Sequence, residues 1–315
     1  MIVSLNGFFL PKEQARISPD DRGFLFGDGV YEAVRSFDGH LFRAAAHWLR
    51  LRRSLAAIGL DGPGESEVRG IAESLLEKNG LLGGEATVYL QVTRGAAPRR
   101  HSYPKPPVPP TVYAFAAPFA LPPEKCDAGV WVITVPDLRW GRCDIKGTSL
   151  LPNVMANEQA HAAGAHEAIL VREGVVTEGS HSNFAGIRDG TLITHPADKF
   201  ILNGITRLVV LDLCRELSIP VDESALTESE LPTLDEAVVL GTTNDVLPVV
   251  RINNCIIGNG RPGPVTRRLQ KSFCELVARE KTSSAAPSPL CSGPTFCEPH
   301  EVGRQAQCRD SHTSL

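Results

Sequence analysis

The sequence predicts an α/β protein that is divided into two domains. Segments of apolar alternation typical of strands, such as EATVYLQVTRG and TVYAFAAPF, occur along the chain together with segments of helical period. The length of 315 residues exceeds the size at which a single core stops growing, about 250–300 residues. A proline-containing stretch over residues 119–125 is typical of a linker. We therefore expect a smaller N-terminal domain over residues 1–118 and a larger C-terminal domain over residues 126–280.

The composition and charge are ordinary for a globular protein. The formal net charge of -4 gives no reason to expect nucleic acid as a partner. No apolar run approaches the roughly 18 residues of a membrane span, and Asn6-Gly7 in the apolar N-terminus indicates a hairpin, not a signal peptide. The eight cysteines lack the spacing of metal ligands, so we expect no metal site and a reducing, cytoplasmic location.

The N-terminal half is expected to pack two helices on a sheet. Strands are predicted over residues 2–9, before the Asp38-Gly39 turn, and over residues 85–95 and 111–119. Helices are predicted from about Trp48 to Ile58 and over residues 65–78, because apolar residues recur there every three or four positions. The prolines of residues 98–110 lack N–H groups, so this stretch predicts a loop.

The C-terminal half repeats the alternation of strands and helices. Strands are predicted over residues 129–135, around the Glu173-Gly174 and Asp189-Gly190 turns, and on both sides of Gly241-Thr242-Thr243. Helices are predicted over residues 149–163, after Arg207, and over residues 263–279. Residues 281–315 are rich in Ser, Pro, Thr and Cys without periodicity, and we expect them to be disordered.

Two segments of the C-terminal half carry candidate catalytic groups. LRWGRCDIK ends at Lys146, and TEGSHSN contains Glu178. A lysine amine can form a Schiff base with an aldehyde cofactor, and a carboxylate beside a pyridine nitrogen keeps that nitrogen protonated, so that the ring can accept electrons. Taken alone, a lysine is usually a solvated surface charge and a glutamate before Gly-Ser is usually a turn residue.

Two turns could bind an anion such as a phosphate. The segment NGITR precedes a predicted helix, whose first N–H groups and dipole attract anions, and Thr206 adds a hydroxyl donor. Gly241-Thr242-Thr243 is a second candidate. Each could equally be an ordinary helix start or turn. The basic cluster around Arg99 and His101 could likewise be a solvated loop tip.

Five segments together resemble a known family. The runs DRGFLFGDGVYE, QVTRGAAPRRH, RWGRCDIK, TEGSHSN and NGITR resemble, in order and spacing, the class IV aminotransferases that use pyridoxal 5'-phosphate, most closely the D-amino-acid transaminases. The likeness covers residues 1 to about 280. It implies the two-domain fold of the D-amino-acid and branched-chain aminotransferases, with the cofactor in the interdomain cleft, and a homodimer. The implied reaction moves an amino group from a D-amino acid such as D-alanine to a 2-oxo acid such as 2-oxoglutarate.

The resemblance also assigns roles to single residues. Lys146 matches the Schiff-base lysine that moves the α-proton, and Glu178 matches the partner of the pyridine nitrogen. The residues that match the phosphate site are Arg50, Ile205, Thr206 and Thr242. The residues that match the binding site for the substrate α-carboxylate are Tyr31, Arg99 and His101, the last two on a loop that the family supplies from the other subunit.

Two positions depart from the family pattern and leave alternatives open. His181 stands where the D-amino-acid transaminases usually carry a serine, and Gly241 replaces a serine near the phosphate turn. His181 could narrow the substrate side-chain pocket or add a titrating group, or it could be an ordinary loop histidine. The alternatives to a D-amino-acid transaminase are an aminodeoxychorismate lyase, a branched-chain L-transaminase, an R-selective amine transaminase, or a cofactor-binding protein without useful turnover. The Arg99-x-His101 pattern favours the D-amino-acid transaminase.

Overall fold

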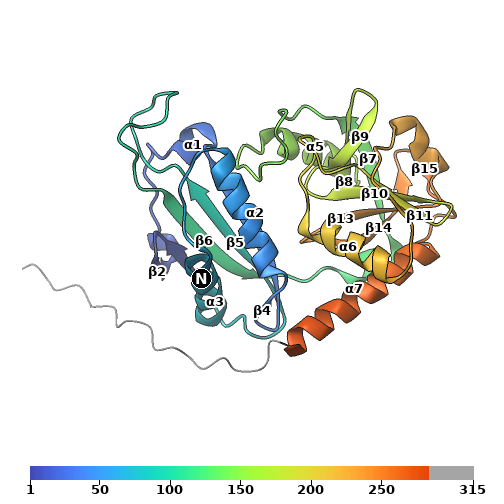
Figure 1. The fold of residues 1–315 in the computed structure, drawn as a ribbon, viewed down its shortest axis with the longest axis horizontal. Coiled ribbons are helices and arrows are strands. Elements are labelled where there is room, and N and C mark those ends of the chain that lie inside the picture. Colours follow the sequence, from blue (N-terminus) through green and yellow to red (C-terminus); the bar gives the residue numbers. More distant parts are fainter. Residues whose placement is uncertain (284–315) are drawn as a thin grey trace, which may run out of the picture. The chain divides into compact units, whose positions relative to one another are not determined.

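The computed structural model describes residues 1–283, which form two β-sheets covered by helices (Figure 1). The predicted α/β class is therefore confirmed. The segment predicted to be disordered, residues 281–315, lies outside the described part except for its first three residues. Within the described part, no helix has both the length and the apolar character needed to cross a membrane.

The first sheet belongs to the N-terminal half and has the order β2-β1-β6-β5-β3-β4. Its strands are β1 (Ile2–Leu5), β2 (Phe8–Pro11), β3 (Gly29–Phe37), β4 (His40–Leu41), β5 (Glu85–Thr93) and β6 (Thr111–Pro118). The helical elements of this half are η1 (Lys12–Gln14), α1 (Arg22–Phe26), α2 (Ala44–Ala57) and α3 (Glu65–Lys78). The predicted apolar faces of α2 and α3, including Leu51 and Leu75, are buried with Val34 and Val88 of the sheet in one core cluster.

The second sheet is mixed and has the order β12-β11-β10-β13-β14-β7-β8-β9, with β15 paired to β14. Its strands are β7 (Val130–Pro136), β8 (Glu167–Arg172), β9 (Val175–Gly179), β10 (Asn183–Arg188), β11 (Thr191–Thr194), β12 (Val221–Asp222), β13 (Glu236–Gly241), β14 (Asp245–Ile252) and β15 (Cys255–Ile256). The helical elements are α4 (Pro123–Ala128), α5 (Leu151–Ala162), α6 (Ile205–Glu216), η2 (Glu228–Thr233) and α7 (Pro264–Ser283). The carboxyl ends of β9 and β13 carry Glu178 and Gly241, so the candidate carboxylate and one candidate phosphate turn both lie at strand ends of this sheet.

Several elements differ from the sequence predictions, among them the helices α1, α4 and α7. Helix α1, which the sequence did not predict, begins because the Asp21 side chain accepts a hydrogen bond from the Gly23 N–H, and it ends at Gly27, whose φ of 65° suits glycine. Helix α4 overlaps the end of the predicted linker. Helix α7 continues to Ser283, beyond the predicted end at residue 279. The division into two domains at residues 119–125 stays a prediction.

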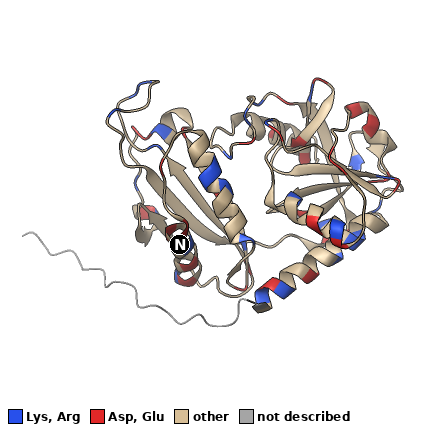
Figure 2. Ribbon diagram, viewed as in Figure 1, with Lys and Arg blue, Asp and Glu red and all other residues tan. Residues whose placement is uncertain are grey.

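Polar contacts connect the N-terminal half to elements of the C-terminal half. The Arg35 guanidinium on β3 lies between the rings of Phe37 and Phe119, pairs with Glu85, and donates to the Thr242 carbonyl at 3.1 Å. At the end of α7, which carries interleaved acidic and basic residues (Figure 2), Glu280 pairs with Arg43 at 2.9 Å. Arg35 therefore holds the turn that carries the candidate phosphate ligand Thr242.

Candidate active site

One cavity of about 1080 Å³ brings most of the predicted site residues together. The predicted residues that line it are Tyr31, Arg50, Lys146, Glu178, His181, Ile205, Thr206 and Thr242. Arg99 and His101 are not among its lining residues. The volume is at the upper end of the roughly 300–1,000 Å³ that is usual for sites of small molecules and cofactors. Motifs far apart in the sequence therefore share one site.

Lys146 lies in the loop between β7 and α5, not on a strand. Its backbone is fixed on both sides, because its N–H donates to Ser54 Oγ at 3.2 Å and its carbonyl accepts from the Tyr31 N–H at 3.0 Å. Lys146 Nζ lies 4.3 Å from the centroid of the Tyr31 ring. Within residues 1–283 it forms no ion pair with a carboxylate. The amine is thus placed at the cavity wall without a fixed counter-ion.

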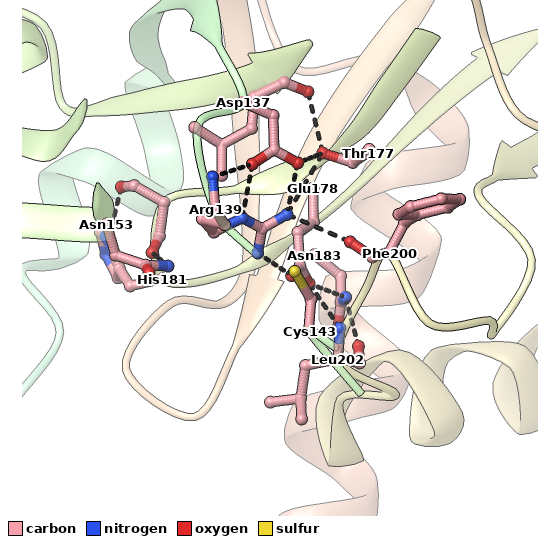
Figure 3. A network of polar contacts seen from close by, with 12 residues as sticks. Asp137, Arg139, Cys143, Asn153, Thr177, Glu178, His181, Asn183, Phe200 and Leu202 are labelled. Atoms are coloured by element: carbon pink, nitrogen blue, oxygen red, sulfur yellow. Dashed lines mark hydrogen bonds and ion pairs between the residues drawn. The ribbon is translucent and has the colours of Figure 1, made fainter. Parts of the chain in front are cut away.

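Glu178 is a buried carboxylate at the end of β9 (Figure 3). One oxygen accepts a hydrogen bond from Arg139, and the other accepts from Asn183 Nδ2 and from the Leu202 N–H, each at 3.0 Å. Burial raises the pKa of Glu178 to about 7, although Arg139 acts to lower it. A carboxyl with this pKa can lose its proton at neutral pH and gains strongly from a nearby cation.

Arg139 is a site residue that the sequence reasoning missed. Its guanidinium forms two 2.9 Å contacts with Asp137 and donates to the Phe200 carbonyl at 3.1 Å, in addition to its bond with Glu178. Burial acts to raise the pKa of Asp137, but Arg139 and Arg172 outweigh it and hold this pKa at about 2. The only sequence signal was its position within the segment LRWGRCDIK. The charged carboxylate of Asp137 thus holds Arg139 in place, and Arg139 in turn fixes Glu178.

Arg50, a predicted phosphate ligand, is held on α2 by Glu32. Its Nε and Nη2 lie 2.7 and 2.9 Å from the Glu32 oxygens, and Nη1 donates to the Asn203 carbonyl at 3.3 Å. Glu32 is fully buried, which acts to raise its pKa, but Arg50 and then His47 lower it to about 2. Arg50 therefore lies beside Asn203, two residues before the start of α6.

The start of α6 offers backbone donors to an anion. No side chain caps this helix, and Ile205 and Thr206 of its first turn line the cavity. Asn183 packs so tightly here that a Cβ added to Gly204 would lie 2.0 Å from Asn183 Oδ1. Because the first N–H groups of a helix lack partners within the helix, they can bind a phosphate. The same Asn183 also donates to Glu178, which links the two subsites.

His181 projects from the turn between β9 and β10. Its Nδ1 lies 3.1 Å from Glu167 Oε1, and its backbone N–H donates to the same oxygen at 2.8 Å. Its side chain is 42% exposed and lines the cavity. That His181 narrows the pocket for the substrate side chain stays a prediction. A Cβ on Gly241 would meet Ser182 at 3.6 Å, an ordinary contact. Packing therefore does not require glycine at this position.

Comparison with known proteins identifies the family. The sequence profile of the family described as amino-transferase class IV matches residues 29–252, a range that includes Lys146, Glu178 and Thr242. The chain belongs to the class IV aminotransferases. The predicted family and the enzyme class are thereby confirmed.

Curated relatives cover nearly the whole described chain. The D-alanine aminotransferase of Staphylococcus epidermidis is 43% identical over 272 residues, which are 86% of this chain and 96% of the relative. The D-alanine aminotransferase of Bacillus licheniformis is 42% identical over 281 residues, 89% of this chain and 98% of the relative.

Solved structures confirm the fold. The branched-chain amino acid aminotransferase of Escherichia coli has a TM-score of 0.82 and 25% identity, over 90% of this chain and 97% of its own. The T.th. enzyme of the same name, complexed with N-(5'-phosphopyridoxyl)-L-glutamate, has a TM-score of 0.81 and 28% identity, over 89% of this chain and 94% of its own. The aminotransferase-like α/β fold predicted from the sequence is therefore confirmed, whereas the cofactor cleft between two domains stays a prediction.

Replacing Glu178 with glutamine should stabilise the cofactor-free protein at alkaline pH. A carboxyl whose pKa rises on folding, here from 4.5 to about 7, contributes stability that is present below pH 4.5 and is lost as the pH rises through about 7. At pH 8 the free energy of unfolding of Glu178→Gln should exceed that of the wild type by about 2–3 kcal/mol, with little difference at pH 5. Urea unfolding at both pH values measures this.

The exposed Glu158, which also lines the cavity, gives a matched control for this prediction. Glu158→Gln should leave stability unchanged at both pH values, because an exposed carboxylate stays hydrated. A Glu178→Gln protein that is less stable than the wild type at pH 8 would show that the hydrogen bonds to Glu178 outweigh its burial.

Proposed function

We propose that the protein is a pyridoxal-phosphate-dependent transaminase that moves the amino group of a D-amino acid, such as D-alanine, to a 2-oxo acid, such as 2-oxoglutarate. One observation carries the proposal: a single cavity combines Lys146 with the buried Glu178 and the uncapped start of α6. The curated relatives named D-alanine aminotransferase support the choice of substrate.

The residues of the cavity fit the three functional parts of the cofactor. Lys146 would hold the aldehyde carbon, because its amine has no competing carboxylate within the described residues. Glu178 would hold the pyridine nitrogen. Burial destabilises its carboxylate and raises its pKa, so a cationic partner would stabilise the charged form. The phosphate would be bound by α6 through Ile205 and Thr206, with Arg50 and Thr242 nearby. When bound, pyridoxal phosphate supplies a protonated ring that accepts an electron pair from the substrate.

The side chains of the chain itself perform the proton transfer and the positioning. Lys146 removes the proton from the substrate α-carbon and returns it as a general acid and base. Tyr31 keeps the amine over its ring, 4.3 Å from the centroid. Arg139 keeps the carboxylate of Glu178 in place through a charge-assisted hydrogen bond. In its ionised form, Glu178 would stabilise positive charge on the pyridine nitrogen that it would hold.

We also propose that Arg99 and His101 bind the substrate α-carboxylate in the site of a second subunit. An arginine fork suits a carboxylate, and neither residue lines the cavity of its own chain. A homodimer is supported by exposed apolar side chains near the cavity. These are Phe24, Trp140, Leu151, Val154 and Met155. Leu151, Val154 and Met155 share one face of α5, which is typical of an interface.

We propose that the enzyme works in the cytoplasm. The cysteines of residues 1–283 are all free thiols, and Cys143 and Cys214 are buried in the protein. Free buried cysteines are usual in a reducing compartment.

The test is the formation of pyruvate from D-alanine and from L-alanine, each with 2-oxoglutarate as acceptor. Activity with D-alanine at least about a hundredfold above that with L-alanine is expected, because the wrong enantiomer leaves a charged group poorly held. Faster turnover of L-alanine would replace the proposal with a branched-chain L-transaminase, the activity named for the related structures. No turnover with either would favour a lyase, an amine transaminase or a cofactor-binding protein.

A further inference from the structure

Two buried arginines share one aspartate next to the loop that carries Arg99 and His101. Arg22 Nε, on α1, donates to Asp28 Oδ2 at 2.8 Å. Arg94 is the residue after β5, and its Nε donates to the same oxygen at 2.8 Å and to Asp28 Oδ1 at 3.1 Å. Arg22 and Arg94 are only 3% and 5% exposed. The Asp28 carboxylate fixes both side chains, because each buried guanidinium charge needs this carboxylate to offset the cost of its removal from water.

Arg94 anchors this cluster to the rest of the N-terminal half. Its two terminal nitrogens donate to the carbonyls of Ile58 and Gly59, at 2.7 and 3.0 Å. These carbonyls lie at the C-terminal end of α2, where the helix dipole favours a cation. The Arg94 Cζ atom lies 3.5 Å from the centroid of the Tyr103 ring, on the far part of the loop. Arg94 thus uses all three of its nitrogens on fixed acceptors.

Arg22 uses one of its two terminal nitrogens on the loop itself. Its Nη1 donates to the Arg100 carbonyl at 2.6 Å and approaches the Ser102 carbonyl at 3.4 Å. These two carbonyls flank His101 in the chain. A charged donor makes a stronger hydrogen bond to a carbonyl than a neutral one does. Arg22 therefore fixes the backbone on both sides of His101.

The ring of Phe26 orients the two exposed side chains. The Arg99 guanidinium carbon lies 5.2 Å from the centroid of the Phe26 ring, and the His101 ring lies 5.6 Å from it at an angle of 52°. Arg22 lies over the same ring at 4.7 Å. Arg99 and His101 are otherwise exposed on a loop whose prolines prevent regular pairing. The contacts to one ring therefore hold both side chains on the same side of the loop.

We propose that Arg22 and Phe26, with Arg22 held by Asp28 and Arg94, are positioning residues that keep Arg99 and His101 in the conformation that binds the substrate carboxylate. The inference rests on the proposed function of Arg99 and His101. Lysine cannot replace Arg22, because a single ammonium lacks the planar fork that reaches Asp28 and the loop carbonyls together.

The experiment compares cofactor-loaded Arg22→Lys and Phe26→Leu proteins with the wild type and with Arg69→Lys. Arg69 is an exposed arginine on α3, so its replacement controls for the loss of a guanidinium. Arg22→Lys should raise KM for D-alanine by about ten- to a hundredfold and change kcat much less, since the clamp binds the substrate but does not move the proton. Arg99→Ala in the same assay shows the effect of losing the clamp itself.

Trypsin supplies a readout that does not depend on turnover. The loop contains cleavage sites after Arg99 and Arg100, and the change from arginine to lysine at residue 22 keeps the number of tryptic sites unchanged. Cleavage in the loop should be about tenfold faster in Arg22→Lys and Phe26→Leu than in Arg69→Lys, because local opening exposes the backbone to the protease.

The outcomes separate the inference from the function on which it rests. If Arg99→Ala raises KM while Arg22→Lys changes neither KM nor cleavage, the positioning role is wrong and the carboxylate clamp stands. If Arg99→Ala leaves KM unchanged, the clamp itself is wrong and the inference fails with it. Should Arg22→Lys not fold, the same criteria apply to Phe26→Leu, whose half-buried ring can be shortened at less cost.

Discussion

The Lys146→Ala protein should lose transamination by a factor of about 10⁴ or more, because it lacks both the amine that holds the cofactor and the general base of the reaction. Its fold should be retained, since Lys146 contributes backbone hydrogen bonds to Ser54 and Tyr31 that alanine keeps. Steady-state rates with D-alanine and 2-oxoglutarate measure the loss, and the melting temperature checks the fold.

Borohydride gives an independent test of the same residue. Reduction turns the link between a lysine amine and the cofactor aldehyde into a stable single bond, so peptide mapping of the reduced wild type should find the label on Lys146. Lys199 is the matched control: it is an exposed lysine whose Nζ lies 5.0 Å from the Phe200 ring, and Lys199→Ala should keep both the label and the activity. A label on any other lysine would contradict the assignment of Lys146 as the lysine that binds the cofactor.

The sequence predicted the longer helices and the candidate turns because their signals are local. The apolar spacing of Val68, Ile71 and Leu75 reports the buried face of α3 directly. The segment NGITR carries its helix start within five residues. Helix α1 escaped prediction because its five residues are too few for a periodic pattern. Its cap, Asp21, also accepts from Thr93 Oγ1, which is 72 positions away in the sequence.

The polar framework behind the site could not be predicted, because its pairs are distant in the sequence. Arg139 meets Glu178 across 39 positions, and Arg94 meets Asp28 across 66. Each is one of many arginines in the chain, and only the fold selects its partner. The motifs thus predicted which groups touch cofactor and substrate, whereas the residues that orient those groups became visible only in three dimensions.

An inactive Lys146→Ala protein mixed with an inactive Arg99→Ala protein should regain activity if the carboxylate clamp acts across a dimer. In a symmetric dimer, the mixed species joins Lys146 of one subunit to Arg99 of the other in one intact site, and loses both residues in the second site. Random exchange at equal concentrations makes about half of the dimers mixed, so about a quarter of the wild-type sites should be restored. Activity measured against mixing ratio should peak at equal amounts of the two proteins.

The size of the effect depends on what Arg99 alone contributes. Loss of a charged group that pairs with the substrate carboxylate costs about 2–4 kcal/mol, or roughly thirty- to a thousandfold in kcat/KM, so the Arg99→Ala background is low. Arg69→Ala mixed with Lys146→Ala is the control. The Arg69 side chain on α3 is 44% exposed, and its loss should leave the Arg69→Ala protein active before mixing. If light scattering and subunit-exchange measurements show mixed dimers but activity stays at the background, Arg99 acts within its own chain. The loop held by Arg22 would then have to close over the cavity of the same subunit, which Arg99 and His101 do not line in this conformation.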